Sequence, residues 1–352
     1  LGNSMSTPAL TWTTLNPAVA SVAGGIVTAV AAGQATIQVT SGLATGYALV
    51  TVSAAASTPV NLWSTAASPT GNALLAVWTP NPTDAWAVGS GGTAVHFNGT
   101  SWTGTLSGTT NSLYGVWGAT PGAVYAVGDQ GRILRYNGSV WDTLPRFTTS
   151  TSLGAIWGAS PADIFVAAGA QLYHYNGSAW SPQTTLPSAV NAIWGASGSD
   201  VWAVTSGGQI YRYDGSSWAQ VFSPTSYSIA TVWGTSASNV YIGAGRGKAF
   251  RWDGVTWYDI TPPQDLTSWP WGYWDWQYVG EFWGSTPADV YAVLVHPSAV
   301  PETWTVHYDG ASWTVVRHDS TGLYALRGTP GGSIHAVGGN GRIVRGYRAA
   351  TV

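Results

Sequence analysis

Six hydrogen-bond donors recur at one position of a repeated segment, each directly before an aromatic residue. They are His96, Arg135, His174, Arg212, Arg251 and His307, and Arg345 holds the same place in the last copy. Imidazole and guanidinium groups donate hydrogen bonds to hydroxyl and anionic groups. One interpretation is therefore a ring of donors that binds a polar or anionic ligand such as a glycan.

The alternative is that each donor is paired inside its own repeat. Four copies carry an aspartate at the start of the preceding apolar run, at Asp84, Asp163, Asp200 and Asp289. A donor bonded to that carboxylate would orient a turn and leave nothing for a ligand. The sequence leaves both interpretations open.

Few residues are suited to catalysis. The chain has six histidines and no cysteine, and no His-x-x-x-His pair or carboxylate cluster has metal-ligand spacing. Hydrolysis of a glycoside needs two carboxyl groups about 5–10 Å apart. Outside the repeat the candidates are Asp265, Asp275, Glu281 and Glu302. We expect no enzyme activity, no cofactor and no metal site.

The densest aromatic run lies in an insertion between Trp257 and Trp283, where a surface loop belongs. Its candidate ligand residues are Trp269, Trp271, Tyr273, Trp274, Trp276 and Tyr278. A second insertion covers 296–302. Loops held by a rigid scaffold often carry function, so these aromatic residues either contact a ligand or partner or form a small cap on the scaffold.

The scaffold follows from a repeat of about 40 residues, a period typical of stacked or radial repeat proteins. Six copies open with tryptophan, at Trp78, Trp117, Trp157, Trp194, Trp233 and Trp283, and Arg327 takes the seventh place. A second apolar run follows in each copy. The third run ends in an aromatic residue, Asn or Asp, and Gly, with another tryptophan three residues later in six copies.

These short runs are rich in β-branched and aromatic residues and are bounded by Gly, Pro, Ser and Asn, which predicts strands. The Asn-Gly and Asp-Gly pairs favour a tight turn between the third strand and a fourth. Four antiparallel strands per unit predict an all-β, seven-bladed β-propeller. The last copy lacks its fourth strand, and we expect residues 60–64, with Trp63, to supply it and close the ring.

The tryptophans of the first run have two interpretations. Their large flat rings could stack on the apolar faces of sugars. Aromatic residues that recur at one position of a propeller more often fill the space between blades, where each buries roughly 150–250 Å². We therefore expect packing.

Residues 1–56 differ from the rest, being rich in Ala, Val and Thr with almost no charge. Residues 12–22 (WTTLNPAVASV) and 24–37 (GGIVTAVAAGQATI) resemble the later half of the bacterial Ig-like group 2 domain. The resemblance implies a small, partial β-sandwich with exposed edges. It also implies a bacterial surface or secreted protein. We expect two domains, 1–56 and 57–352.

The repeats over residues 60–348 resemble tectonin-type and other lectin-like bacterial propellers. The fourth copy illustrates this with Val201-Trp202-Ala203-Val204, then Gln209-Ile210-Tyr211-Arg212, then Asp214-Gly215 and Trp218. The resemblance implies a binding scaffold. Trp-Gly in the first strand departs from the lectin pattern, so the resemblance does not carry a sugar specificity.

Composition excludes several classes of protein. Charged residues make up 8% of the chain and the net charge is −3, without the clustered Lys and Arg of nucleic-acid binding proteins. No apolar run reaches the roughly 20 residues of a membrane span. A start at Leu1 suggests a processed product.

We predict a non-enzymatic, extracellular binding or adhesion protein that recognises a glycan or a surface protein. One alternative is a structural subunit of an appendage, filament or surface assembly, with self-assembly through residues 1–56. A polysaccharide hydrolase or lyase is a further alternative.

Overall fold

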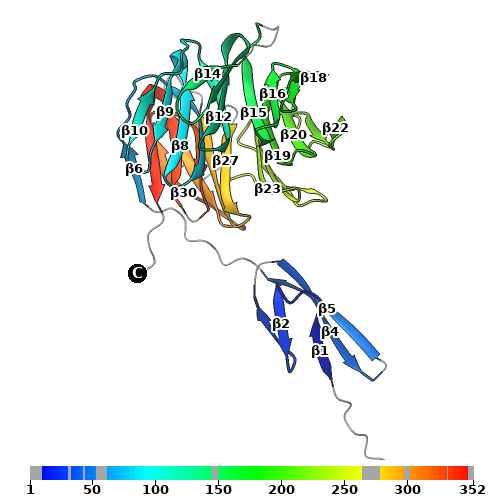
Figure 1. Ribbon diagram of the computed structural model, residues 1–352. Coiled ribbons are helices and arrows are strands. Elements are labelled where there is room, and N and C mark those ends of the chain that lie inside the picture. The colour runs from blue at the N-terminus through cyan, green and yellow to red at the C-terminus, as the bar shows by residue number, and fades with distance from the viewer. Residues whose placement is uncertain are drawn as a thin grey trace, which may run out of the picture. The chain divides into compact units, whose positions relative to one another are not determined.

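The chain divides into two compact units, Leu1–Ser57 and Thr58–Val352. The computed structural model describes residues 10–30, 33–42, 44–52, 62–144, 150–263, 278–296, 302–330 and 332–347. Almost all of the regular structure is β-strand (Figure 1).

The first unit consists of two small antiparallel sheets. The strands are β1 (Thr11–Thr14), β2 (Ala20–Ala23), β3 (Ile26–Ala29), β4 (Gly33–Ser41) and β5 (Ala44–Val52). One sheet has the order β1-β4-β5, and β2 pairs with β3 in a hairpin. Gly24 and Gly25 form the hairpin turn with φ of 58° and 83°, a backbone region that favours glycine.

The second unit contains seven four-stranded antiparallel sheets in its described residues. The first strands are β7 (Leu74–Asn81), β11 (Leu113–Thr120), β15 (Leu153–Ser160), β19 (Val190–Ser197), β23 (Ile229–Ser236), β27 (Tyr278–Thr286) and β31 (Leu323–Gly328). The second strands are β8 (Asp84–Gly89), β12 (Ala123–Gly128), β16 (Asp163–Ala168), β20 (Asp200–Thr205), β24 (Asn239–Ala244), β28 (Asp289–His296) and β32 (Ile334–Gly338).

The outer half of each sheet contains two further strands. The third strands are β9 (Ala94–Phe97), β13 (Arg132–Tyr136), β17 (Gln171–Tyr175), β21 (Ile210–Tyr213), β25 (Ala249–Trp252), β29 (Glu302–Tyr308) and β33 (Ile343–Tyr347). The fourth strands are β10 (Trp102–Thr105), β14 (Trp141–Thr143), β18 (Trp180–Thr185), β22 (Trp218–Val221), β26 (Trp257–Asp259), β30 (Trp313–Asp319) and, in the last sheet, β6 (Leu62–Ala66).

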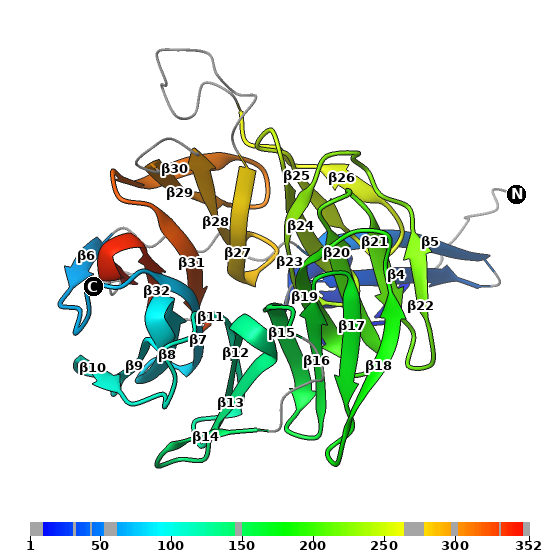
Figure 2. The same ribbon diagram turned by 90° about the horizontal axis from the view of Figure 1, so that it is seen from above.

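The sheets surround a common centre, with the first strands innermost and the fourth strands at the periphery (Figure 2). Each first strand contacts the first strand of the next sheet, and β31 contacts β7, so the contacts run in a closed cycle. The repeated four-stranded sheets resemble a β-propeller.

The last sheet combines strands from distant parts of the sequence. β6 pairs antiparallel with β33, with Trp63 opposite Gly346 and Leu62 opposite Tyr347. The Trp63 ring also lies 6.4 Å from that of Tyr291, edge to face. The segment around Trp63 is therefore the fourth strand of this sheet.

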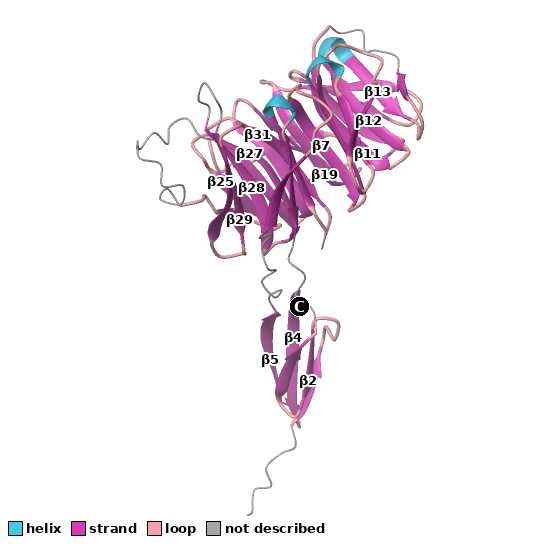
Figure 3. Cartoon of the chain, turned by 90° about the vertical axis from the view of Figure 1, so that its left-hand side faces the viewer, coloured by secondary structure: helices cyan, strands magenta, loops and turns pink. Residues whose placement is uncertain are grey.

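The connections between strands form two opposite rims. The turn rim holds the connections from first to second and from third to fourth strands. There Asn98 Oδ1 accepts hydrogen bonds from the backbone N–H groups of Thr100 and Ser101, both 3.0 Å, and Gly99 has φ of 94°. The loop rim holds the other connections, including three short 3-10 turns, Ser90–Gly92, Asp129–Gly131 and Gly339–Gly341 (Figure 3).

Adjacent sheets are joined by a tryptophan of one sheet packed on a glycine of the next. A β-carbon at Gly118 would lie 2.6 Å from the Trp78 ring, and one at Gly195 would lie 2.5 Å from the Trp157 ring. The same relation joins Gly158 to Trp117, Gly234 to Trp194 and Gly328 to Trp283. The packing interpretation of the first-strand tryptophans is therefore correct for these five residues.

The junction between the last and first sheets departs from this rule. Arg327 takes the place of the tryptophan, and Thr79 takes the place of the glycine in the next sheet. Arg327 Nη1 donates to Glu281 Oε1 at 2.6 Å and to the carbonyl oxygens of Phe282 and Leu326 at 3.1 and 2.9 Å. The arginine thus points back toward the sixth sheet, and the seventh junction has no tryptophan wedge.

Arg327 and Thr79 are exceptions at the same junction, so we expect substitutions at the two positions to have coupled effects on stability. Arg327→Trp should lower the free energy of unfolding by about 1–3 kcal/mol, because the new ring overlaps the Thr79 side chain. Thr79→Gly alone should also destabilise, since Thr79 Oγ1 bonds the carbonyl oxygens of Asn81 and Asp84, both at 2.8 Å.

In the double variant the two costs should be less than additive, as for residues in contact. Urea unfolding of all four proteins measures this coupling. Strictly additive costs would contradict it.

Candidate functional site

The predicted donors lie opposite the aromatic residue of the second strand in their own sheet. Trp86 is the cross-strand partner of His96, Phe165 of His174, and Tyr291 of His307. Arg135, Arg212, Arg251 and Arg345 lie opposite the equivalent second-strand residue in their own sheets. The repeat therefore fixes where each donor points.

Four donors bond the aspartate that opens the second strand. The pairs are His96 Nε2 with Asp84 Oδ1 at 2.9 Å, His174 Nε2 with Asp163 Oδ1 at 2.7 Å, Arg212 Nε with Asp200 Oδ1 at 2.6 Å, and His307 Nε2 with Asp289 Oδ1 at 3.0 Å. In the fifth sheet Asn239 replaces the aspartate and accepts from Arg251 Nε at 2.7 Å. Internal pairing therefore accounts for five of the predicted ligand residues.

These donors also pack on aromatic rings. The His96 ring stacks on Trp86 at 4.3 Å between centroids, and the His174 ring stacks on Phe165 at 4.4 Å. The Arg212 guanidinium lies 4.9 Å from the centre of the Trp202 ring. These contacts fix the orientation of the ring or guanidinium group within its own sheet.

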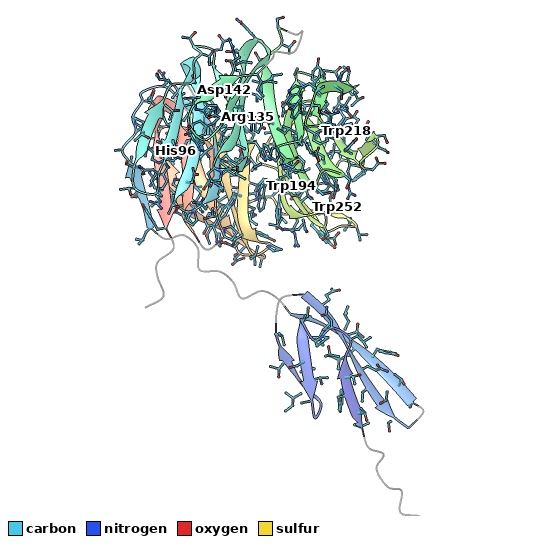
Figure 4. All side chains as sticks on the ribbon, viewed as in Figure 1. His96, Arg135, Asp142, Trp194, Trp218 and Trp252 are labelled. Carbon is cyan, nitrogen blue, oxygen red and sulfur yellow. The ribbon has the colours of Figure 1, made fainter. Side chains whose placement is uncertain are left out.

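Arg135 differs from the other five. Its sheet begins the second strand at Ala123, so the carboxylate or amide found in the other sheets is missing from that position. The side chain is exposed, and its guanidinium lies 6.0 Å from the centre of the Tyr125 ring. Figure 4 marks Arg135 and His96 on their strands.

The most buried pair brings three residues with catalytic potential together. Asp289 bonds both the Ser285 hydroxyl and the His307 imidazole, and the His307 and Asp289 side chains are 3% and 0% exposed. In a hydrolytic triad the imidazole lies between the hydroxyl and the carboxylate. Here the carboxylate lies in the middle and both His307 and Asp289 are buried, so the arrangement fits a structural role.

The two insertions both leave from the loop rim. Trp269, Trp271, Tyr273, Trp274 and Trp276 lie outside the described residues. Tyr278 begins β27, pairs with Val295 and forms a bridge with Gly245 of the fifth sheet. Burial raises the pKa of Tyr278. Tyr278 is thus a packed strand residue rather than a loop residue.

Sequence patterns missed an exposed group on the loop rim, between the fourth and fifth sheets. It consists of Tyr227 and Arg246, together with Phe222 in the same β22–β23 connection as Tyr227, and we call these three residues the rim patch. Phe222 is 78% exposed and Tyr227 37%, and the Arg246 guanidinium lies 5.0 Å from the centre of the Tyr227 ring. Arg246 has φ of 59°, a region that few residues other than glycine adopt. The flanking Gly245 and Gly247 were the only sequence signal for this loop.

A recess of about 660 Å³ lies on the same rim between the first and second sheets. Its lining includes Gly92, Leu106, Thr109, Asn111 and Arg132, and Leu106 is 93% exposed. Arg132 is the one charged side chain in this lining. The recess offers hydroxyl, amide and guanidinium groups to a polar partner.

The centre of the ring holds a smaller channel of about 190 Å³, lined by residues from all seven first strands. Its charged lining residues are Glu281 and Arg327, which form the ion pair described above. Glu281 was a candidate catalytic acid, and another, Glu302, lies 3.4 Å from His318 Nε2. Asp265 and Asp275 lie outside the described residues.

The described residues lack both a metal-binding cluster and a membrane-spanning helix. They contain no group of three or more His, Asp or Glu side chains that could hold a metal ion. They also contain no helix long and apolar enough to cross a membrane.

Comparison with known proteins supports both units. The Bacterial Ig-like domain (group 2) family matches residues 3–55, a kind of domain typical of bacterial surface proteins. A search of curated protein sequences finds no significant match to the chain.

Solved β-propeller structures are similar to the second unit. "YCF48 bound to D1 peptide" has a TM-score of 0.64 and 16% identity, covering 81% of this chain and 95% of its own. The WD40 β-propeller domain of Doa1 has a TM-score of 0.62 and 11% identity, covering 82% and 98%.

The extracellular domain of the putative one component system BT4673 from B. thetaiotaomicron has a TM-score of 0.60 and 14% identity, covering 78% of this chain and 38% of its own. At these identities the likeness shows the fold alone.

His335 is a fully buried titratable residue in the last sheet. It takes the place of the second-strand aromatic residue in the last sheet, 5.0 Å from the Phe97 ring and 5.5 Å from the Trp102 ring. Burial, and then the positive charge of Arg345, lower the pKa of His335 to about 3. Between pH 6.5 and 3 the unfolded chain therefore binds a proton at His335 that the folded protein excludes.

This proton difference predicts that stability falls as the pH drops through that window. The slope should be steeper than in His335→Phe by about 1.4 kcal/mol per pH unit, with no difference in slope above pH 7. Urea unfolding at a series of pH values measures both slopes. Parallel curves for the two proteins would mean that His335 does not cause the effect.

Proposed function

We propose that this chain is a non-enzymatic, extracellular bacterial binding protein that recognises a protein partner through the loop rim. In this proposal residues 57–352 form a seven-bladed β-propeller closed by β6, and residues 1–56 form an Ig-like spacer. The Ig-like family match supports the surface location.

The rim patch is the observation that carries the proposal. Tyr227 exposes aromatic surface beside the Arg246 guanidinium, and Phe222 exposes more in the same β22–β23 connection. Aromatic residues and arginine dominate the binding energy of protein interfaces. A surface phenylalanine that is 78% exposed contributes little to folding, because the apolar ring stays in water. Because donors inside the sheets are paired within their own sheets, the loops are the part of the molecule that differs from one sheet to the next.

Topology adds a second argument. β6 begins and β33 ends at the turn rim, so the chain enters and leaves the second unit on the side opposite the rim patch. The similar fold of YCF48 has been solved with a bound peptide, which supports a protein or peptide as the class of partner.

Glycan recognition is the second candidate, supported by the aromatic sequence of residues 269–276. The lectin-type use of the repeated donors is less favoured, since His96, His174, Arg212 and His307 each bond an aspartate. Among the described residues, no group of acids supports a role as a polysaccharide hydrolase or lyase.

Selection of peptides from a displayed random library, with the whole chain as bait, tests the proposal. Phe222→Ser with Tyr227→Ser should raise the Kd of selected peptides at least about tenfold, because aromatic anchors of an interface contribute about 2 kcal/mol or more each. Val140→Ser with Val255→Ser is the matched control, since these residues are 57% and 83% exposed in turn-rim connections.

The control should leave the Kd unchanged. Peptides that bind the rim-patch variant and the native chain equally would contradict the proposal. Binding on a glycan array without any selected peptide would contradict it in favour of the second candidate.

A further inference from the structure

The first unit leaves a long strand edge open. Within the described residues β5 pairs with β4 on one side and with no strand on the other. Natural edge strands are protected by charged residues, proline, bulges or short length. β5 is nine residues long and contains no charged residue and no proline, and its register with β4 is unbroken from Ala44 to Val52.

The unit also leaves most of its large apolar side chains in water. Its buried cluster is small, formed by Val19, Ala20 and Ala35. Ile26 is 73% exposed, and on β5 Tyr47 is 67% and Leu49 65% exposed. Of 17 exposed large hydrophobic residues in the described chain, seven belong to this unit: Leu10, Leu15, Ile26, Val27, Val30, Tyr47 and Leu49. An exposed apolar surface next to an unprotected edge indicates a site for another strand.

We propose that β5 pairs antiparallel with β5 of a second copy of this chain. The two sheets then join as one six-stranded sheet in the order β1-β4-β5-β5-β4-β1. A two-fold interface places the same patch against itself, so any charge on that patch would face a like charge. The sequence contains no Asp, Glu, Lys, Arg or His before Asp84, which makes this edge suited to its own copy.

The side-chain pattern of β5 fits the same pairing. Tyr47 and Leu49 lie on one face of the sheet, beside Gln38 and Thr36 of β4. With the two-fold axis at Ala48, Tyr47 lies opposite Leu49 of the second copy, and Leu49 opposite the second Tyr47. Aromatic and aliphatic residues opposite each other across strands are stabilising pairs. The pairing therefore covers the two largest exposed side chains of β5.

The mass of the whole chain in solution tests the pairing. The native protein should reach twice its monomer mass of 36.7 kDa as its concentration rises in sedimentation equilibrium. Tyr47→Lys with Leu49→Lys should remain a monomer, because the variant places four ammonium groups at the shared edge. Phe222→Lys is the matched control and should dimerise like the native chain.

Cross-linking tests the register without disturbing the edge. The chain has no cysteine, so Ala48→Cys introduces a single thiol. Directly opposite residues of antiparallel strands have Cα atoms about 4.5–5.5 Å apart, within reach of a disulfide. Mild oxidation should link the variant into dimers. Ala219→Cys, at an exposed position of the outer strand β22, should give few cross-linked dimers.

Three results would overturn the pairing. The first is a native chain that stays monomeric across the concentration series. Slow exchange of the β5 amide protons in that monomer would show that a segment of the same chain covers the edge. The second is a dimer that persists in the double-lysine variant. The third is equal cross-linking at residues 48 and 219. Peptide binding by the rim patch is measured separately and should be unchanged in the double-lysine variant.

Discussion

The second unit depends on one repeated contact, the tryptophan ring of one sheet lying on a glycine of the next. Any side chain at that position would overlap the ring, as the 2.5 Å approach of a β-carbon at Gly195 to Trp157 illustrates. Glycine usually weakens a strand because it has no side chain to pack. Here the tryptophan fills the space that the missing side chain leaves, and this contact joins five pairs of neighbouring sheets.

A closed ring must join its last sheet to its first, and this junction is built differently. Arg327 turns back to Glu281 and leaves Thr79 without an aromatic neighbour from the last sheet. Two other contacts strengthen the closing sheet. β6 supplies its fourth strand, and the buried carboxylate of Asp319 in β30 bonds both Arg317 and Arg342, the latter from the last sheet. These contacts lie within the last sheet or join it to the sixth. Across the junction with the first sheet, the His335 ring lies 5.0 Å from the Phe97 ring and 5.5 Å from the Trp102 ring, so aromatic packing takes the place of the wedge there.

The sheets could be predicted from the sequence because the strand patterns recur in successive copies of the repeat. Turns such as Asn98-Gly99 were predictable because glycine adopts the positive φ that the turn requires and the asparagine side chain accepts hydrogen bonds from the turn backbone. Sequence spacing also placed Asp84 and His96 at constant positions, but it could not show that their side chains meet at 2.9 Å. That outcome depends on strand register and on the pleat, which turn both residues to one face.

The rim patch was not predictable for the opposite reason. Phe222, Tyr227 and Arg246 occur once, in connections of unequal length, so no repetition marks them. Tyr227 and Arg246 come together because the β22–β23 connection meets the β24–β25 connection of the fifth sheet. The repeated part of the sequence thus encodes the scaffold, and the unrepeated part holds the candidate contacts with a partner.

The most direct test of the tryptophan–glycine contact is the loss of stability caused by adding one methyl group to the glycine. This loss is measured with the tryptophan present and with the tryptophan removed. Gly195→Ala should lower the free energy of unfolding by about 1–3 kcal/mol, whereas Gly154→Ala, where nothing lies within 4 Å of a β-carbon, should cost far less. In a Trp157→Ala background the account predicts that the cost of Gly195→Ala nearly disappears. An equal cost in both backgrounds would contradict the claim that the tryptophan and glycine hold adjacent sheets together.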